Sequence, residues 1–402
     1  MELYSLSFVL LVTVGLLLYY TVLRTRQWLC LLGLSLVFFA ASGWQDFTFL
    51  LFTALTVWGG GLCLAKLDTD AAARRKQPGL PKEEKKTIKA QTTRRKKGVL
   101  AGILVVNFLV LGYFKYWSHF AALLSGAWAA STPSALGLVM PLGISFYTFQ
   151  TMSYTIDVYR GDTRAQRSII NFGTFVTLFP QLIAGPIIKY KDLGDQIDQR
   201  TCSTDKFASG VQTFMVGMAK KVLIANNVGM LWESYKAMAL GELTVAGSWL
   251  GVLAFTFQIY FDFSGYSGMA IGLGRMLGFE FLPNFNYPYI SKSITEFWRR
   301  WHISLSTWFR EYLYIPLGGN RCSKPRWMFN LLVVWAATGI WHGASWNYLI
   351  WGLYFFVLLM VEKFFLLDRL SRAPAAVGHI YTMFFVLVSW AIFAIEDAGH
   401  LA

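Results

Sequence analysis

The sequence predicts an all-α, polytopic membrane protein, and three observations lead to that prediction. The 402 residues are 55% hydrophobic and only 14% charged, whereas soluble domains carry about 25% charged residues. Uncharged apolar runs recur along the chain, and about 20 such residues in a helix cross roughly 30 Å of hydrocarbon. The runs are continuous rather than alternating every second residue, which excludes a membrane β-barrel. An ordinary soluble enzyme is excluded as well.

The apolar runs define the predicted spans in chain order. The first run lacks a basic start and a small-residue cleavage site, so it is interpreted as a retained span rather than a removed signal peptide. The clear spans are 5–23, 28–42, 44–65, 99–117, 136–156, 247–272, 327–341, 347–366 and 379–396. With re-entrant segments, we predict about 9 to 11 membrane segments in a single membrane-embedded domain over residues 1–402. Interfacial amphipathic helices complete the predicted fold.

The charge distribution indicates topology rather than a nucleic-acid surface. The net charge is +14, and 12 of the 36 Lys and Arg residues fall between Lys66 and Lys97, in one connection between apolar runs. Basic connections remain in the cytoplasm. A cytoplasmic 66–97 connection places Arg24 and Arg160 on the same side and the N-terminus outside. No nucleic acid is predicted as a partner.

Two segments leave the topology open. Segment 169–188 contains Pro180 and Pro186, which interrupt a helix where the backbone must find other partners. Re-entry from the cytoplasm is favoured over a full span, and it requires residues 207–231 to cross. That crossing contains Lys220 and Lys221, each costing roughly 2.5–3.5 kcal/mol at the bilayer centre unless it snorkels or faces a cavity. The alternative lays 207–231 on a membrane surface.

His342 is the first candidate for chemistry. No Asp, Glu, Lys or Arg occurs from Trp327 to Val361, and His342 is the only histidine there. A single helix of that length would measure about 52 Å, so the chain must turn near His342, with arms of about 22 Å. The turn would then lie below the membrane surface and bury His342. A histidine at that depth is a candidate proton acceptor, and a core histidine bonded to a backbone carbonyl is the alternative.

The second candidate is the Trp-rich, basic segment 295–312. Its apolar face has the 3, 4, 3, 4 spacing of one helix, and is formed by Trp298, Trp301, Leu305, Trp308 and Tyr312. Such a helix normally lies in the membrane interface. His302 lies within this segment and is a candidate site residue.

A carboxylate in an apolar run and four cysteines complete the survey. Asp262 lies in the span 247–272, four residues after Gln258 and on the same helical face. A polar link between helices and a binding role both remain open for Asp262. The cysteines have neither metal-ligand spacing nor a disulfide framework, so no metal is predicted; they are Cys30, Cys63, Cys202 and Cys322.

Five motifs give a family resemblance. FWRRWHISLSTW at 297–308, YLYIPLGGNR at 312–321 and WHGA at 341–344 resemble the signature of membrane-bound O-acyltransferases. PLGISFYTFQ at 141–150 and FPQLIAGP at 179–186 resemble the bacterial branch that includes the alginate O-acetylation membrane protein. The resemblance covers about residues 135–355. Relatives of that branch tend to continue beyond the point where this chain ends, so a C-terminal span is expected to be missing.

The resemblance implies transfer of an acyl group, usually acetyl, in the bacterial cytoplasmic membrane. The donor would be acetyl-CoA or another cytoplasmic acyl thioester, with no permanently bound cofactor. The acceptor would be a hydroxyl of an extracytoplasmic polysaccharide, or an SGNH-type partner protein that completes the transfer. D-alanyl transfer to teichoic acid is the alternative within the family, and a non-catalytic acyl or glycan transporter is the alternative outside it.

The resemblance also assigns roles to residues. His342 would be the catalytic histidine and His302 the second histidine of the motifs. Arg299, Arg300 and Arg310 could bind phosphates of coenzyme A, although anionic membrane lipids would explain them as well. The full set of donor-binding or substrate-binding candidates is Trp301, Arg299, Arg300, Arg310, Glu311, Asn347 and Asp262.

Overall fold

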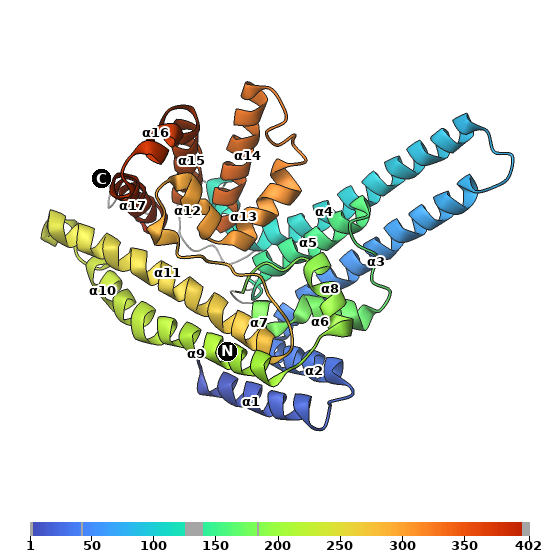
Figure 1. The fold of residues 1–402 in the computed structure, drawn as a ribbon, viewed down its shortest axis with the longest axis horizontal. Helices are drawn as coiled ribbons and strands as arrows, with labels where there is room; N and C mark the ends of the chain where they lie inside the picture. Colours follow the sequence, from blue (N-terminus) through green and yellow to red (C-terminus); the bar gives the residue numbers. More distant parts are fainter. Residues whose placement is uncertain (1–2, 42, 125–139, 183–184, 396–402) are drawn as a thin grey trace. The chain divides into compact units, whose positions relative to one another are not determined.

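The computed structural model describes all residues except 1–2, 42, 125–139, 183–184 and 396–402. The described residues form helices and their connections, with no strand among them (Figure 1). The all-α prediction is therefore confirmed. The chain divides into two compact units, of which the first comprises residues 1–183 and 187–201 and the second residues 184–186 and 202–402. The single domain over 1–402 stays a prediction.

The first unit packs three long helices around short ones. Its helices are α1 (Leu6–Tyr20), α2 (Gln27–Ala40), α3 (Trp44–Arg75), α4 (Lys82–Leu124), α5 (Ile144–Arg160), α6 (Ile169–Thr177), α7 (Phe179–Leu182) and α8 (Tyr190–Gln199). Helix α5 packs against both α3 and α4 and is almost entirely buried. Of the predicted span 136–156, residues 136–139 lie outside the described residues.

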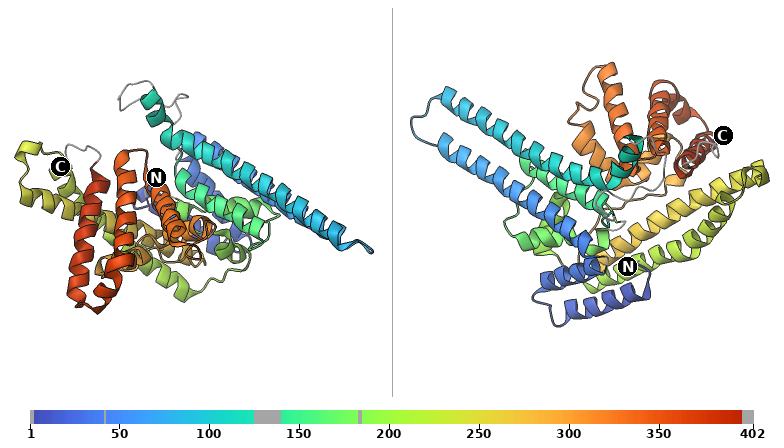
Figure 2. Two further views of the ribbon diagram at one scale, coloured as in Figure 1. Left: turned by 90° about the horizontal axis from the view of Figure 1, so that it is seen from above. Right: turned by 180° about the vertical axis from the view of Figure 1, so that it is seen from behind.

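The predicted spans 44–65 and 99–117 continue as helix well into the basic connection between them. Helix α3 ends only at Arg75 and α4 begins at Lys82, so a helical hairpin extends past α5 (Figure 2). The extension is rich in Ala, Lys, Arg and Glu, which have high helix propensity. Lys96 fixes its base, because its Nζ lies 2.6 Å from the Asp68 carboxylate and donates to the Tyr159 carbonyl at 3.1 Å.

The predicted interruption in 169–188 is present. Helix α6 ends at Thr177, and α7 is a single turn from Phe179 to Leu182 that contains Pro180. Side chains satisfy the freed backbone, since the Phe175 carbonyl accepts from Gln150 at 3.0 Å and from Gln181 at 3.3 Å. Residues 183–184 lie outside the described part. Re-entry of this segment from the cytoplasm stays a prediction.

The second unit contains the candidate histidines. Its longer elements are α9 (Thr204–Ala219), α10 (Asn226–Lys236), α11 (Val245–Met276), α12 (Ile294–Arg300), α13 (Ile303–Phe309), α14 (Lys324–His342), α15 (Trp346–Val361), α16 (Leu367–Arg372) and α17 (Ala375–Ala394). Five-residue π-helical turns follow α13, at Arg310–Tyr314, and α15, at Glu362–Leu366. Figure 1 shows α14, α15 and α17 grouped around α12 and α13.

Residues 204–236 form a continuous helical segment with an irregularity at the two lysines. A π-helical stretch from Lys220 to Ala225 joins α9 to α10. Lys221 forms an ion pair with Asp262 of α11, and its Nζ lies 5.3 Å from the centre of the Tyr266 ring. Pairing lowers the cost of placing Lys221 at membrane depth. Whether the segment spans or lies on a surface stays a prediction.

Among the residues that the structure describes, four helices are long and apolar enough to cross a membrane, at Phe47–Arg75, Lys82–Trp117, Trp346–Arg372 and Ala375–Ala394. Shorter apolar helices occupy Leu6–Tyr20 and Gln27–Ala40. These findings agree with a multi-pass membrane protein. The larger number of crossings given above stays a prediction.

Candidate functional site

The predicted continuous helix over 295–312 is wrong, because the chain breaks at His302. Helix α12 ends at Arg300, α13 begins at Ile303, and His302 has left-handed backbone angles of φ 43° and ψ 54°. A residue with a β-carbon rarely adopts that conformation, at a cost of about 1–3 kcal/mol, and such strain is concentrated at functional sites. The 3, 4, 3, 4 spacing correctly indicated which side chains are buried, although it did not indicate one helix. The buried residues are Trp301, Leu305, Trp308 and Tyr312.

A short connecting strip holds the break in place. The Ile303 amide donates to the Asn284 carbonyl at 2.9 Å, and the Asn286 amide donates to the Arg300 carbonyl at 2.9 Å. The side-chain oxygen of Asn284 accepts from the amide and hydroxyl of Ser304, at 3.1 and 2.9 Å. Residues 284–286 therefore fix both sides of the break, and sequence reasoning missed them.

The same Asn284 oxygen determines which nitrogen of His302 is protonated. His302 Nδ1 lies 3.2 Å from Asn284 Oδ1. The Ser304 amide can only donate, so the Asn284 atom that it contacts must be the oxygen. An oxygen that already accepts must receive a proton from the imidazole, which places the hydrogen on Nδ1. Nε2 of the neutral ring then carries the lone pair.

His302 is fully enclosed by protein. Its side chain is 2% exposed, with the Phe263 ring of α11 at 4.7 Å and the Trp341 ring of α14 at 6.2 Å between centroids. His302 lies outside the candidate spans, and burial lowers its pKa to about 3. Desolvation disfavours the imidazolium. The imidazole is therefore neutral over the physiological pH range and a weak proton acceptor.

His342 lies at the turn that the sequence predicts. Helix α14 ends at His342 and α15 begins at Trp346. Gly339 and Gly352 let the two helices approach closely, because a β-carbon at Gly352 would lie 3.3 Å from the Gly339 Cα. The protein itself half-buries the His342 side chain, and its depth in the membrane stays a prediction. The arms of the turn leave part of this ring accessible.

Aromatic rings hold the His342 imidazole. Trp351 and Phe393 pack edge-on at 5.1 and 5.2 Å between centroids, and Tyr348 stacks at 6.4 Å. The side-chain amide of Asn347 donates to the Phe393 carbonyl at 2.8 Å and connects the start of α15 to the end of α17. Asn347 thus supports His342 indirectly, by fixing Phe393, whose ring packs against the imidazole.

One indole connects the two histidines. Trp341 packs edge-on against His342, at 4.9 Å between centroids, and the same ring faces His302 at 6.2 Å. The structure therefore places against one indole the two residues that the motifs single out, although they are 40 positions apart in the chain. Trp341 is buried, so each imidazole is positioned against a fixed surface.

Trp301 belongs to the aromatic core of this unit. Its ring lies 4.8 Å from Trp390, 5.1 Å from Phe285 and 5.6 Å from Phe297, and it is 4% exposed. These contacts give Trp301 a packing role beside His302.

A buried carboxylate that sequence reasoning missed anchors α12. Glu362 is fully buried, and its oxygens accept from the Ile294 amide at 2.5 Å and from the amide and hydroxyl of Thr295 at 2.9 and 2.7 Å. An anion at a helix N-terminus satisfies amides that have no partner in the helix. The available signal was position, because Glu362 is the first charged residue after the long uncharged run.

The arginine candidates occupy two places. Exposed Arg299 and half-buried Arg300 line a polar groove of about 670 Å³ together with Lys292, Ser293 and Asp368. Arg300 pairs with Glu296 at 2.8 Å. The other two candidates lie beyond α13, where Arg310 pairs with Glu311 at 3.7 Å.

Asp262 joins helices rather than the histidine pair. Its ion pair with Lys221 links α11 to the π-helical stretch, and the next residue, Phe263, contacts His302. Glycines let α11 and α9 approach closely here, because a β-carbon at Gly265 would lie 2.8 Å from the Gly217 carbonyl. The geometry agrees with the polar link that the sequence left open.

Comparisons with known proteins add relatives of three kinds. The chain is 47% identical to a protein of Azotobacter vinelandii named probable alginate O-acetylase AlgI, over 73% of this chain and 59% of that protein. A peptidoglycan O-acetyltransferase of Helicobacter pylori is 34% identical, over 73% of this chain and 61% of its own length. A teichoic acid D-alanyltransferase of Bacillus subtilis is 29% identical, over 66% of this chain and 68% of its own length.

The chain spans about six tenths of the length of the probable alginate O-acetylases of Azotobacter vinelandii and Pseudomonas aeruginosa. A family profile described as MBOAT, the membrane-bound O-acyltransferase family, matches residues 160–396. That range includes both histidines, the break at His302 and the turn at His342. The chain therefore belongs to the membrane-bound O-acyltransferase family.

Proposed function

We propose that this protein is a membrane O-acyltransferase that moves acetyl from a cytoplasmic thioester to a hydroxyl. The observation that carries the proposal is that His302 and His342 both pack edge-on against the Trp341 indole. The alginate and peptidoglycan O-acetylating relatives support acetyl as the group and a polysaccharide as the final acceptor. The D-alanyl-transferring relative is less similar, so acetyl is preferred over D-alanyl.

His342 is proposed as the general base. The acceptor hydroxyl loses its proton to the imidazole while its oxygen attacks the thioester carbonyl. The carbon–sulfur bond then breaks, the proton returns to the departing thiolate, and the products are an ester and a free thiol. A thioester is already activated, so a positioned base, worth about 10²–10⁴ in rate, is the main requirement. Half-exposed His342 is the more accessible of the two imidazoles.

His302 is proposed to accept a hydrogen bond rather than a proton. Its Nε2 carries the lone pair, because Nδ1 donates to Asn284, and its low pKa keeps that nitrogen unprotonated at neutral pH. Such an acceptor orients a hydroxyl without competing for its proton. His302 would thus position the acceptor, once substrate binding opens the enclosure around its ring, while His342 performs the proton transfer.

The groove beside α12 is the proposed site for the phosphates of the donor. Lys292, Arg299 and Arg300 provide cations there, and guanidinium groups bind phosphate with paired hydrogen bonds. Acetyl-CoA fits this site because it carries both a thioester and several phosphates. Arg310 and Glu311, which pair with each other, remain candidates for a later step or for lipid contacts.

The acceptor side is proposed from the relatives. Transfer would pass to an SGNH-type partner protein or directly to a polysaccharide outside the cytoplasmic membrane. The experiment is reconstitution of the purified protein in vesicles with [1-¹⁴C]acetyl-CoA on the donor side and a soluble SGNH-type partner on the other. We expect ester-linked label on the partner and one free thiol for each label transferred. Label that crosses as intact donor, without thiol release, would identify a transporter.

The proposed location is a bacterial cytoplasmic membrane with the N-terminus outside and residues 66–97 in the cytoplasm. The prediction is that a cysteine at Gln77, in the exposed connection between α3 and α4, resists an impermeant thiol reagent in intact cells. It should react after the membrane is permeabilised. Native Cys202 and Cys63 are exposed, so the background with all cysteines replaced is the required control. Labelling of intact cells would reverse the orientation of the whole chain.

A further inference from the structure

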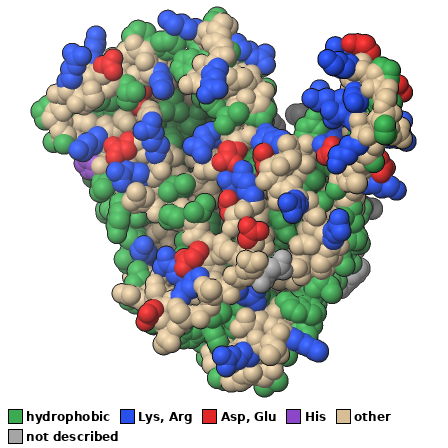
Figure 3. Space-filling view, turned by 45° about the vertical axis from the view of Figure 1, so that its right-hand side comes forward, with side chains coloured by type: hydrophobic (Ala, Val, Ile, Leu, Met, Phe, Trp, Pro, Cys, Tyr) green, Lys and Arg blue, Asp and Glu red, His purple; other side chains and the backbone are tan. Residues whose placement is uncertain are grey.

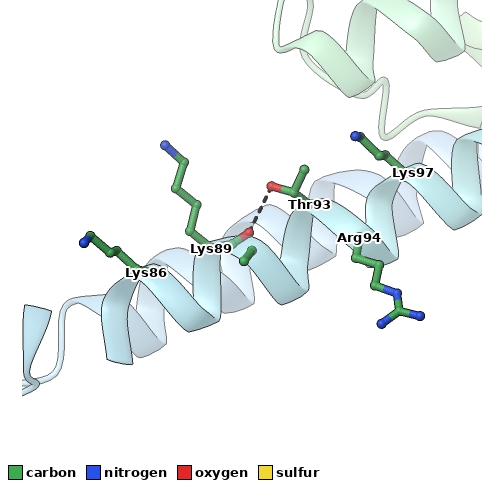
Figure 4. Close-up of a pocket in the computed structure, with 6 residues that line it drawn as sticks. Lys86, Lys89, Thr93, Arg94 and Lys97 are labelled. Atoms are coloured by element: carbon green, nitrogen blue, oxygen red, sulfur yellow. Dashed lines mark hydrogen bonds between the residues drawn. The ribbon is translucent and has the colours of Figure 1, made fainter. Parts of the chain in front are cut away.

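The extension of the α3–α4 hairpin has a basic face that the acyl-transfer proposal does not use. Lys86, Lys89, Thr93, Arg94 and Lys97 line an open hollow on α4 together with Ala90, and Arg94 points away from Lys89 and Lys97 (Figure 4). At 3.6 residues per turn the four cations spread over about 140° of the helix, so they form one broad face with Lys86 and Lys97 near its middle. The cations follow the helix for about 16 Å at 1.5 Å per residue. Lys and Arg side chains also cover the projecting end of the hairpin in the space-filling view (Figure 3). We call Lys86, Lys89, Arg94 and Lys97 the basic stripe.

Most cations of the basic stripe have no carboxylate partner among the described residues. All four cations are exposed. Lys86 has one solvated partner, Glu83, at 3.1 Å. Within the described part of the chain, no carboxylate lies within ion-pair distance of Lys89, Arg94 or Lys97. Neighbouring Lys96, in contrast, points to Asp68 and fixes the hairpin base. Four like charges on one face repel one another, so an external anion would stabilise them.

The composition of the stripe distinguishes between the two main classes of anionic partner. Protein interfaces are enriched in aromatic residues and depleted in lysine, and they need a well-packed apolar anchor. The stripe contains three lysines, and the groove between them offers only Ala90 and Thr93. A fluid surface of phosphate headgroups needs no such anchor. The residues therefore favour lipid over a protein.

The position of the stripe along α4 also favours lipid. The apolar part of α4 begins at Gly98, directly after Lys97. Headgroup layers add about 5–7 Å beyond the hydrocarbon on each side, and electrostatic attraction reaches about 8 Å further at physiological ionic strength. With a tilt of about 20° and a rise of 1.5 Å per residue, Lys89 lies roughly 13 Å from the hydrocarbon and Lys86 roughly 17 Å. Lys89, Arg94 and Lys97 thus lie within reach of anionic headgroups, and Lys86 lies just beyond that range.

We propose that the basic stripe on α4 is a binding site for the headgroups of anionic membrane lipid, with phosphatidylglycerol as the probe. The site would hold anionic headgroups around the part of α4 that directly follows the membrane boundary at Gly98. It is independent of acyl transfer, because none of its residues belongs to the histidine site or to the groove beside α12.

The test compares two quadruple variants of the full-length protein with equal loss of charge. Lys86→Gln, Lys89→Gln, Arg94→Gln and Lys97→Gln remove the stripe. The matched control changes exposed cations that do not line it, namely Arg74→Gln, Arg75→Gln, Lys76→Gln and Arg95→Gln. Binding of fluorescent phosphatidylglycerol and phosphatidylcholine is measured in neutral detergent micelles at 0.15 M salt, about the physiological ionic strength. Elution on size exclusion verifies that each variant is folded.

We expect the wild-type protein and the control to prefer phosphatidylglycerol, and the stripe variant to lose that preference by at least about tenfold. Inorganic phosphate at matched ionic strength should not compete, which separates a lipid surface from a free-phosphate site. Equal loss in the control would overturn the proposal in favour of a net-charge effect. A wild-type protein without any preference would overturn it as well and leave the stripe to an acidic soluble partner.

Discussion

Replacing His342 with alanine is expected to abolish acyl transfer while leaving the protein folded and in the membrane. The ring lies at the end of α14 and is half-exposed, so its removal loses edge contacts with Trp351 and Phe393 without emptying a fully buried position. Without it, no group at that position takes the hydroxyl proton. Loss of a general base costs roughly 10²-fold or more, about 3 kcal/mol of barrier. The measurement is ester-linked acetyl on the surface glycan of cells that lack their own copy of the gene.

Two further variants separate chemistry from structure at His342. His342→Gln retains a polar side chain of similar length, so it preserves packing against Trp351 and Phe393 but cannot take up a proton at neutral pH. It should lose transfer as completely as the alanine variant. His379→Gln changes an exposed histidine of α17 and should retain wild-type transfer. Acetylation at the wild-type level by either His342 variant, with the protein present by immunoblot, would exclude His342 as the base.

The sequence predicted the fold class and the turn at His342 because both depend on composition over many residues. The uncharged run from Trp327 to Val361 is longer than a single membrane-spanning helix, so a turn within it was unavoidable. The same reasoning failed at His302. Periodicity reports which side chains are buried, and two short helices that share one buried face repeat with the same spacing as one long helix. Only the pairing of residues 284–286 with residues 300–303 forces the break.

Long-range partners explain the remaining failures. Asn284 contacts His302 across 18 positions, and Glu362 holds α12 across 68. Neither residue belongs to a local pattern, so no window along the chain connects it with the site. Lys221 illustrates the same limit, because its cost at membrane depth falls once Asp262 of another helix is its partner. Pair interactions between distant segments decide which of several plausible local structures forms.

His302 should control acyl transfer through its unprotonated Nε2. The rate of transfer is expected to fall about tenfold to a hundredfold in His302→Gln, which corresponds to one or two well-placed hydrogen bonds. A second variant tests the tautomer argument. Asn284→Asp places a carboxylate against Nδ1, which favours the imidazolium and raises the His302 pKa from about 3 toward neutrality. Transfer by this variant should then fall as the pH drops through the new pKa, whereas the wild-type protein should show no such loss attributable to His302.

The pH dependence of stability provides an independent readout of the same group. Folded His302 has a pKa of about 3, below its usual value of about 6.5 in an unfolded chain. Between those values the unfolded chain binds the extra proton, so the stability contributed by neutral, buried His302 is fully present above pH 6.5 and declines as the pH falls. The unfolding midpoint in detergent should therefore drop less steeply between pH 7 and 5 for His302→Gln than for the wild-type protein. Identical slopes, together with an unchanged pH profile of transfer in Asn284→Asp, would mean that His302 is neither buried as a neutral base nor positioned for the reaction.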